Sequence, residues 1–208
     1  SLFISNVPPS GDERPFQANV LKEVRDNVRA LKTERPIFLS VMGLTYFAFL
    51  SGLFELTILV YAKDMVGAND IHTSFMLIFL ALGIGLGSFL AGKFSDGKVE
   101  LGLVPLGTLG LSFFCVMLGW SYHSFIGVCI NLFLLGIFSG FFIVPLNSLI
   151  QQDSPPERRG QILATNNFLS FSGILIGSGV LYIFRQFLHL NPAQIFIMCG
   201  FLTVLGTV

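Results

Sequence analysis

Residues 125–150 read FIGVCINLFLLGIFSGFFIVPLNSLI and contain no Asp, Glu, Lys or Arg. A helix that crosses the hydrocarbon core of a bilayer needs about 20 predominantly apolar residues. This stretch therefore predicts a membrane-spanning helix. Similar apolar runs lie on both sides of it, at 36–62, 73–92, 101–120, 160–184 and 193–208. We expect an all-α membrane protein with six transmembrane helices.

The composition of the whole chain supports this expectation. Of its 208 residues, 53% are hydrophobic and 12% are charged, whereas soluble proteins have about 25% charged residues. The formal net charge is zero and Lys and Arg form no basic patch, which argues against nucleic acid as a partner. Cys115, Cys129 and Cys199 lie inside apolar runs without the spacing of a metal site. We interpret them as packing residues and expect neither a metal nor a cofactor.

The orientation in the membrane is predicted from the polar segments, which are short enough to make neighbouring helices antiparallel. Segment 1–35 and the second and fourth connections between helices hold ten of the twelve Lys and Arg, whereas the opposite side holds only Lys63 and Arg185. Because short cytoplasmic loops are enriched in Lys and Arg, we predict that segment 1–35 is cytoplasmic. Trp120, Tyr122 and Tyr61 then fall at the outer interface, where aromatic rings are common.

Two parts of the chain differ in character. We expect a cytoplasmic connector over 1–35 and a six-helix transmembrane half-domain over 36–208. Apolar residues at helical spacing predict an amphipathic helix over 15–35, which serves either as a hinge or regulatory contact or as a simple connector. The sequence starts without Met and stops inside its sixth apolar run. We therefore expect a piece of a longer protein, with a truncated sixth helix.

Small residues recur at four-residue spacing in three of the expected spans. The pairs are Gly83 and Gly87, Gly136 and Gly140, and Gly173 and Gly177. Membrane helices associate through close backbone approach at such positions, so we interpret these glycines as packing residues. The stretches 83–88 and 173–178 share the pattern Gly-x-x-x-Gly-Ser, which hints at a repeat of three helices.

Glu55 is the one formally charged residue well inside a predicted span. An ionisable group at this depth must face protein or a water-filled cavity. Ser51 lies one turn earlier on the same helical face. The pair is either a substrate- or proton-linked site or a carboxyl group that reaches water near the helix end.

Amide side chains also occur in the predicted spans. They are Asn131, Asn147, Asn166 and Asn167. Such amides either bind a polar headgroup or form hydrogen bonds between helices.

Charges of both signs meet in two predicted cytoplasmic loops. The loop residues are Lys93, Asp96, Lys98, Arg158 and Arg159. An ion pair between Asp96 and Arg158 or Arg159 would latch one packing of the helices and release another. The alternative is that the positive charges only set the topology.

The first of these loops resembles the signature loop of the major facilitator superfamily. Four residues match that pattern: Gly87, Leu90, Ala91 and Lys93. Gly92 stands where the family has an acidic residue and Ser95 where it has Gly, so the latch role passes to Asp96 or is absent.

Three further stretches are similar to the bacterial lysophospholipid transporter branch of that family, including the form fused to an acyltransferase and an acyl-carrier-protein synthetase. They are RPIFLSVMGLTYF at 35–47, VELGLVPLG at 99–107 and VPLNSLIQQ at 144–152. This resemblance implies the C-terminal half of a twelve-helix transporter, whose first, second, fourth and fifth spans line a cavity with the N-terminal six-helix half. Glu55 and the four asparagines lie on those spans.

The implied function is movement of a lysophospholipid, lysophosphatidylethanolamine in particular, from the outer to the inner leaflet of the bacterial inner membrane for reacylation. A transporter of drugs or other small solutes within the same family is the main alternative. An intramembrane enzyme is disfavoured, because His72, His123 and His189 lie in or beside loops and none has Asp five residues later. Any acyltransferase or synthetase would lie outside this sequence. A membrane scaffold would leave Glu55 without an evident use.

Overall fold

The structure is a computed structural model that describes residues 20–95 and 99–206. In this part of the chain every regular element is a helix. The elements are α1 (Val20–Leu31), α2 (Arg35–Asp64), α3 (Asp70–Ser95), α4 (Leu103–Trp120), the short 3-10 turn η1 (Ser121–His123), α5 (Phe125–Asp153), α6 (Arg159–Gln186) and α7 (Pro192–Leu205). Helices α2 to α6 are long and apolar enough to span a membrane, and α7 is a shorter apolar helix. The predicted all-α membrane fold is confirmed.

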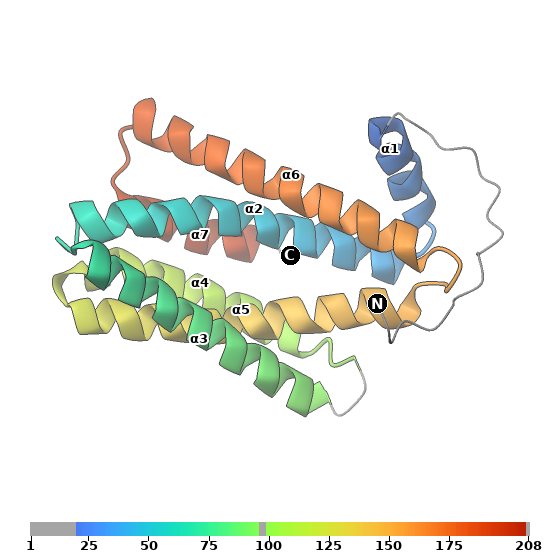
Figure 1. Cartoon of the computed structure of the whole chain (residues 1–208), viewed down its shortest axis with the longest axis horizontal. Coiled ribbons are helices and arrows are strands. Elements are labelled where there is room, and N and C mark those ends of the chain that lie inside the picture. The colour runs from blue at the N-terminus through green and yellow to red at the C-terminus, as the bar shows by residue number, and fades with distance from the viewer. Residues whose placement is uncertain (1–19, 96–98, 207–208) are drawn as a thin grey trace, which may run out of the picture.

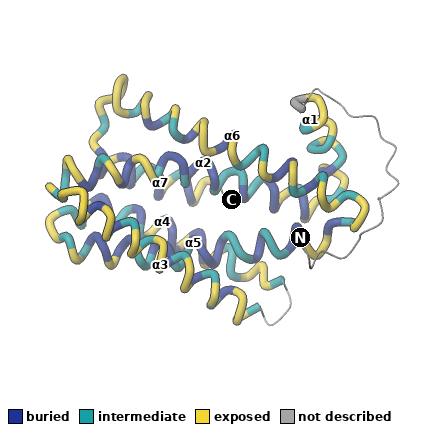
Figure 2. Tube along the Cα trace, in the orientation of Figure 1, coloured by how far each residue is buried: buried dark blue, intermediate teal, exposed yellow. Residues whose placement is uncertain are grey.

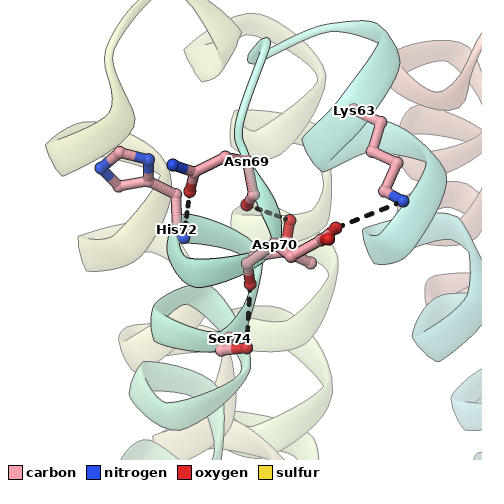
Figure 3. Close-up of polar contacts among 6 residues, drawn as sticks. Lys63, Asn69, Asp70, His72 and Ser74 are labelled. Atoms are coloured by element: carbon pink, nitrogen blue, oxygen red, sulfur yellow. Dashed lines mark hydrogen bonds and ion pairs between the residues drawn. The ribbon is translucent and has the colours of Figure 1, made fainter.

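Side-chain caps explain where several helices begin. Asn69 accepts a hydrogen bond from the backbone N–H of His72 at 2.8 Å (Figure 3), so α3 starts before the expected apolar run at 73. Ser124 caps α5 by accepting from the N–H of Gly127 at 3.2 Å. Asn191 forms a capping box with Gln194 at the start of α7. Such caps satisfy backbone N–H groups that have no partner inside the helix, which lets the connections stay short.

The helices pair in a pattern that relates two groups of three. Helix α2 packs along α6, α3 packs along α5, and α4 packs on both α5 and α7 (Figure 1). Suppose that α2, α3 and α4 correspond to α5, α6 and α7 in that order. The α2–α6 pair then corresponds to the α5–α3 pair, and the α4–α7 pair corresponds to itself. The contacts therefore agree with the three-plus-three repeat indicated by the shared Gly-x-x-x-Gly-Ser pattern.

The paired helices approach each other at glycines. A Cβ atom on Gly83 would overlap the carbonyl oxygen of Phe133, and one on Gly136 would overlap that of Leu80, so α3 and α5 touch backbone to backbone. On α6, a Cβ on Gly173 would lie 2.7 Å from the carbonyl oxygen of Thr45 on α2. These contacts support the interpretation of the glycines as packing residues.

Hydroxyl groups join the helices behind these pairs. Tyr61 on α2 donates to the carbonyl of Leu118 on α4 at 2.7 Å, and Ser112 on α4 donates to that of Gly200 on α7 at 2.8 Å. The placement of Tyr61 at the outer lipid interface was therefore wrong: its side chain is fully buried because its hydroxyl finds a partner inside the bundle. Trp120 is 67% exposed, as an interface residue requires.

Burial differs strongly between the helices. Figure 2 shows α5 buried along much of its length, whereas α3 and α6 carry many exposed residues. Cys115, Cys129 and Cys199 are buried free thiols, in agreement with their interpretation as packing residues. Helix α1 is amphipathic, with its charged side chains exposed from Lys22 onward and Leu31 only 1% exposed.

We predict that Gly83→Ala and Gly177→Ala each lower the free energy of unfolding by about 1–3 kcal/mol, because the added methyl group forces the paired backbones apart. A Cβ on Gly177 would overlap the carbonyl oxygen of Phe49. The measurement is thermal unfolding of the purified full-length protein in detergent.

The chain supplies matched controls two residues further along each helix. A Cβ on Gly85 or Gly179 has nothing within 4 Å, and Ala is the better helix former by about 1 kcal/mol. Gly85→Ala and Gly179→Ala should leave the midpoint unchanged or slightly raised. Equal losses for both members of a pair would contradict the assigned helix contacts.

Candidate functional site

A cavity lies between α2 and α3 and extends into the bundle, where α5, α4 and α7 contribute to its lining. Its position follows from the helix pairing: α2 packs along α6 and α3 along α5, and the two make little contact with each other. Most of the lining is apolar. It includes Leu50, Ile58, Leu77, Leu80, Ile84 and Leu135.

Aromatic packing holds the α2 side of this cavity. Phe47 stacks on Phe142 of α5 with ring centroids 5.5 Å apart, and Phe54 packs against Phe196 of α7 at 4.8 Å. Phe142 and Phe196 are themselves buried. Because aromatic pairs of this kind are stabilising beyond their buried area, the wall is formed before any ligand arrives.

Four side chains with oxygen atoms line the cavity, and two of them are already used. Ser139 donates to the carbonyl of Leu135 at 3.0 Å, and Thr203 donates to that of Cys199 at 2.7 Å. The other two are Ser51 and Glu55, one helical turn apart on α2. The sequence prediction that Ser51 and Glu55 share one face is confirmed, and both line this cavity.

Glu55 is exposed, and within residues 20–95 and 99–206 it forms no hydrogen bond or ion pair. It precedes Asp64, the last residue of α2, by nine positions, or about 14 Å at 1.5 Å per residue. Its side chain lines the cavity, and an ionisable group inside a membrane span faces protein or a water-filled cavity.

The four asparagines do not join Glu55 in this cavity. Asn131 donates to the carbonyl of Gly127 and to the hydroxyl of Ser121, both toward the start of α5. Asn147 donates to the carbonyl of Ile143 on its own helix at 3.1 Å.

The two asparagines of α6 differ in environment. Asn167 is exposed. Asn166 is buried at 7% exposure, and its Oδ1 has no hydrogen-bond partner among the residues that the structure describes. Buried polar groups are nearly always paired, so Asn166 stands out as a buried residue of α6 with an unused acceptor.

The structure gives Arg158 a partner that the sequence did not indicate. Its Nη1 lies 3.1 Å from Oε1 of Glu34, with both side chains about one-third exposed (33% and 29%). Arg159 donates to the carbonyl of Ser154 at 3.2 Å, and Lys93 is exposed at the end of α3. Asp96 and Lys98 lie outside the described residues.

Helix α1 makes further contacts beside this ion pair. The amide of Asn27 donates to the hydroxyl of Thr165 at 3.1 Å and accepts from the amide of Gln161 at 2.5 Å. Together with Glu34 and Arg158, these residues join the segment that precedes α2 to the first two turns of α6. We refer to these five residues as the α1–α6 clasp: Asn27, Glu34, Arg158, Gln161 and Thr165.

The opposite end of the same helix pair carries a second ion pair. Arg185 near the end of α6 lies 3.0 Å from Asp64 at the end of α2. Lys63 lies 3.4 Å from Asp70 at the start of α3 (Figure 3). Ion pairs thus link α2 both to α3, the next helix in the chain, and to the sequence-distant α6 at this end of the bundle.

The clasp and the aromatic wall were missed in the sequence because their partners are far apart in the chain. Glu34 and Arg158 are separated by 124 positions, and no spacing rule connects them. The available signal was limited to Asn27, a polar residue between Val24 and Val28 on the expected apolar face of α1.

No group of three or more His, Cys, Asp or Glu side chains in the described residues is arranged to hold a metal ion. The arrangement instead offers an apolar cavity with one charged group, in a bundle of membrane-spanning helices built from two related halves of three. These features define a class, the multi-pass α-helical membrane transporters with internal repeats. The chain belongs to the Major Facilitator Superfamily, whose family model matches residues 1–178.

Three curated relatives carry one and the same name, lysophospholipid transporter LplT. The relative from Photorhabdus laumondii is 33% identical over 97 residues, which cover 46% of this chain and 24% of the relative. Those from Escherichia fergusonii and an Enterobacter species (strain 638) are each 26% identical, over 84% and 73% of this chain.

The chain spans less than half the length of these relatives: 45% of the Escherichia fergusonii protein and 38% of the Enterobacter protein. No solved structure matches it significantly. The family and the names of the relatives indicate a transporter rather than an enzyme.

We predict that Arg158→Glu undocks α1 from α6, because it places two carboxylates side by side at a partly buried site. Amide hydrogen exchange in 22–31 should become about fivefold faster, equivalent to about 1 kcal/mol for a partly exposed pair. The double variant Arg158→Glu with Glu34→Arg should restore slow exchange.

The control is Arg25→Glu, which removes the exposed ion pair between Arg25 and Asp26 on α1 itself. Its exchange should match that of the unmodified protein. If the double variant exchanges as fast as the single one, the Glu34–Arg158 pair does not hold α1 in place.

Proposed function

We propose that this chain is the C-terminal half of a twelve-helix transporter that moves a lysophospholipid across the bacterial inner membrane. The observation that carries the proposal is the apolar cavity between α2 and α3 with Glu55 and Ser51 on its wall. The name of the relatives, lysophospholipid transporter, supports the same substrate class. Such a substrate needs both an apolar surface and a polar anchor, and the cavity offers both.

The apolar lining suits the acyl chain. Each methylene group removed from water contributes about 0.8 kcal/mol, and side chains such as Leu77, Leu80 and Ile84 provide the required surface. The headgroup is held at Glu55 and Ser51. Asn131, Asn147, Asn166 and Asn167 remain candidates for headgroup contacts elsewhere on the transport path, and the unused acceptor of Asn166 favours that residue among them.

The remainder of the protein supplies the other side of the transport path. We propose that an N-terminal six-helix half packs against the face of this half on which α3 and α6 keep exposed apolar residues. The excess of Lys and Arg on one side makes segment 1–35 cytoplasmic. The substrate then moves from the outer to the inner leaflet, where it is reacylated by an enzyme outside this sequence.

The cytoplasmic latch is proposed to involve the α1–α6 clasp. Glu34 and Arg158 provide its ion pair. Lys93, Asp96, Lys98 and Arg159 are further charged residues of the two loops that the sequence predicts to be cytoplasmic. An ion pair of this kind stabilises one conformation of a transporter and is exchanged when the helices move. Asp96→Ala should shift the balance between inward-open and outward-open forms, measured by cysteine accessibility from each side.

The alternative function is export of a drug or another small solute. The same cavity favours it, because a single carboxylate in apolar surroundings also fits an amphipathic cation. The two functions differ in whether a phosphate-bearing lipid is accepted.

We predict that the full-length protein in proteoliposomes moves lysophosphatidylethanolamine between leaflets, and that Glu55→Gln lowers the rate at least about tenfold. Thermal unfolding should remain unchanged, because Glu55 has no partner among the described residues whose loss would cost stability. A panel of small solutes is measured in parallel. Transport of solutes with no lysophospholipid movement would exclude the proposed substrate, and an unchanged rate for Glu55→Gln would make that residue structural.

A further inference from the structure

The exposed side of α1 carries a row of positive charges that the proposed function does not use. The basic row consists of Lys22, Arg25 and Arg29 on α1 and Lys32 directly after it, and all four residues are exposed. We propose that the basic row binds the headgroups of anionic phospholipids in the leaflet that surrounds the beginnings of α2 and α6. This goes beyond the proposed function and takes from it only the cytoplasmic placement of segment 1–35.

The helix gathers charges that are interspersed in the sequence. The four basic residues follow one another at intervals of three, four and three positions, and residues three or four apart lie on one face of a helix. Because acidic residues stand between them in the sequence, no basic run is visible there. The folded helix therefore presents a basic surface that the linear pattern does not reveal.

The basic row keeps positive charge that no carboxylate of the described residues neutralises. Asp26 lies beside the row and pairs with Arg25 at 3.6 Å. Glu34 pairs with Arg158 of the clasp. Within residues 20–95 and 99–206, neither Arg29 nor Lys32 forms an ion pair. These two cations are available to an anion from outside the bundle.

The other side of α1 is fixed to the bundle. Leu31 is only 1% exposed and belongs to the main hydrophobic core. The amide of Asn27 donates to the hydroxyl of Thr165 on α6 at 3.1 Å. Figure 1 shows α1 beside the end of the bundle where α2 and α6 begin, with its axis across theirs. Because this side is held, the basic row faces away from the core.

The clasp also sets the height of α1 in the membrane. Helix α6 has 28 residues and is about 42 Å long at 1.5 Å per residue, whereas the hydrocarbon core is about 30 Å thick. The ends of α6 therefore extend into the layer of lipid headgroups. Gln161 and Thr165, the partners of Asn27, lie in the first two turns of α6. This contact holds α1 at the depth of the lipid phosphates.

Charge and position together favour an anionic lipid as the partner. Guanidinium and ammonium groups form strong hydrogen bonds with phosphate, and the cytoplasmic leaflet of a membrane has a negative surface potential. Val24 and Val28 are only partly buried and lie between the clasped side and the basic row. An apolar strip flanked by Lys and Arg is typical of helices that lie in a membrane interface.

The test measures amide hydrogen exchange of residues 22–31 in the full-length protein. The protein is reconstituted in nanodiscs of phosphatidylcholine alone, or of phosphatidylcholine and phosphatidylglycerol in equal amounts. A partner that binds only the ordered helix makes its opening rarer. With phosphatidylglycerol we expect exchange to be at least about fivefold slower, the effect of a single cation near an anionic surface. High salt should reduce the difference.

A pair of double variants locates the response on the basic row. Arg29→Gln with Lys32→Gln should lose most of the response and leave thermal unfolding unchanged, because both side chains are exposed. The matched control is Glu23→Gln with Asp26→Asn, which neutralises as many charges on the same helix and should keep or strengthen the response. Comparing the proteins in the same bilayer removes the influence of the surface potential on the exchange reaction itself.

An equal response in the unmodified protein and in Arg29→Gln with Lys32→Gln would overturn the lipid contact. Exchange that is equally slow in both bilayers would also overturn it, because the clasp or an acidic protein segment would then hold α1 without lipid. The Arg25→Glu control for the clasp is measured in neutral detergent, where the basic row has no anionic partner.

The outcome is independent of the proposed function. Nanodiscs offer phosphatidylglycerol on both faces, so the response does not depend on which side of the membrane α1 occupies. If the response appears and no lysophospholipid is transported, the lipid contact stands and the proposed function is wrong. If lysophospholipid is transported and the response is missing, the lipid contact is overturned and the proposed function stands.

Discussion

Close backbone contact at glycines is the interaction on which the rest of this structure depends. Lipid tails are as apolar as Leu, so burial alone does not hold membrane helices together. Gly83 and Gly136 bring α3 onto α5, and Gly173 and Gly177 bring α6 onto α2. Helix α2 therefore packs on α6 and helix α3 packs on α5, and α2 and α3 make little contact with each other. The cavity that holds Glu55 lies between them as a direct result of that pairing.

The α2–α6 pair has properties that suit a moving element. Ion pairs join its two ends, at Glu34 with Arg158 and at Asp64 with Arg185, while the glycines join its middle. The two helices are therefore held along their full length and would move as one body. Because Glu55 lies on α2, any displacement of this pair also displaces the anchor that we propose for the headgroup. The clasp with α1 attaches the preceding segment to the same body.

The elements predicted from the sequence are those that depend on local pattern. Apolar length located the helices, four-residue spacing located the glycine contacts, and the rarity of intramembrane charge singled out Glu55. The predictions that were wrong or missing concern which helices contact one another. An aromatic ring near a helix end, such as that of Tyr61, predicts a position at the membrane interface. The hydroxyl of Tyr61 instead donates to the carbonyl of Leu118 on α4, and the side chain is buried. The ion pair between Glu34 and Arg158 likewise joins residues 124 positions apart in the chain, which no local pattern predicts.

The placement of Glu55 argues for function over packing. Charged groups with a structural role in membrane helices are paired with one another or with the backbone. The neutral hydroxyl groups of Ser139 and Thr203 in the same lining are likewise bonded to backbone carbonyls. Glu55 has neither kind of partner among the described residues, and its neighbours Phe47 and Phe54 are held by rings that do not need it. A carboxylate without a contact among the described residues is compensated either by water near the end of α2 or by a partner that enters the cavity or closes over it, and we propose the second. The apolar walls and the family to which the chain belongs both favour a transported amphiphile as that partner.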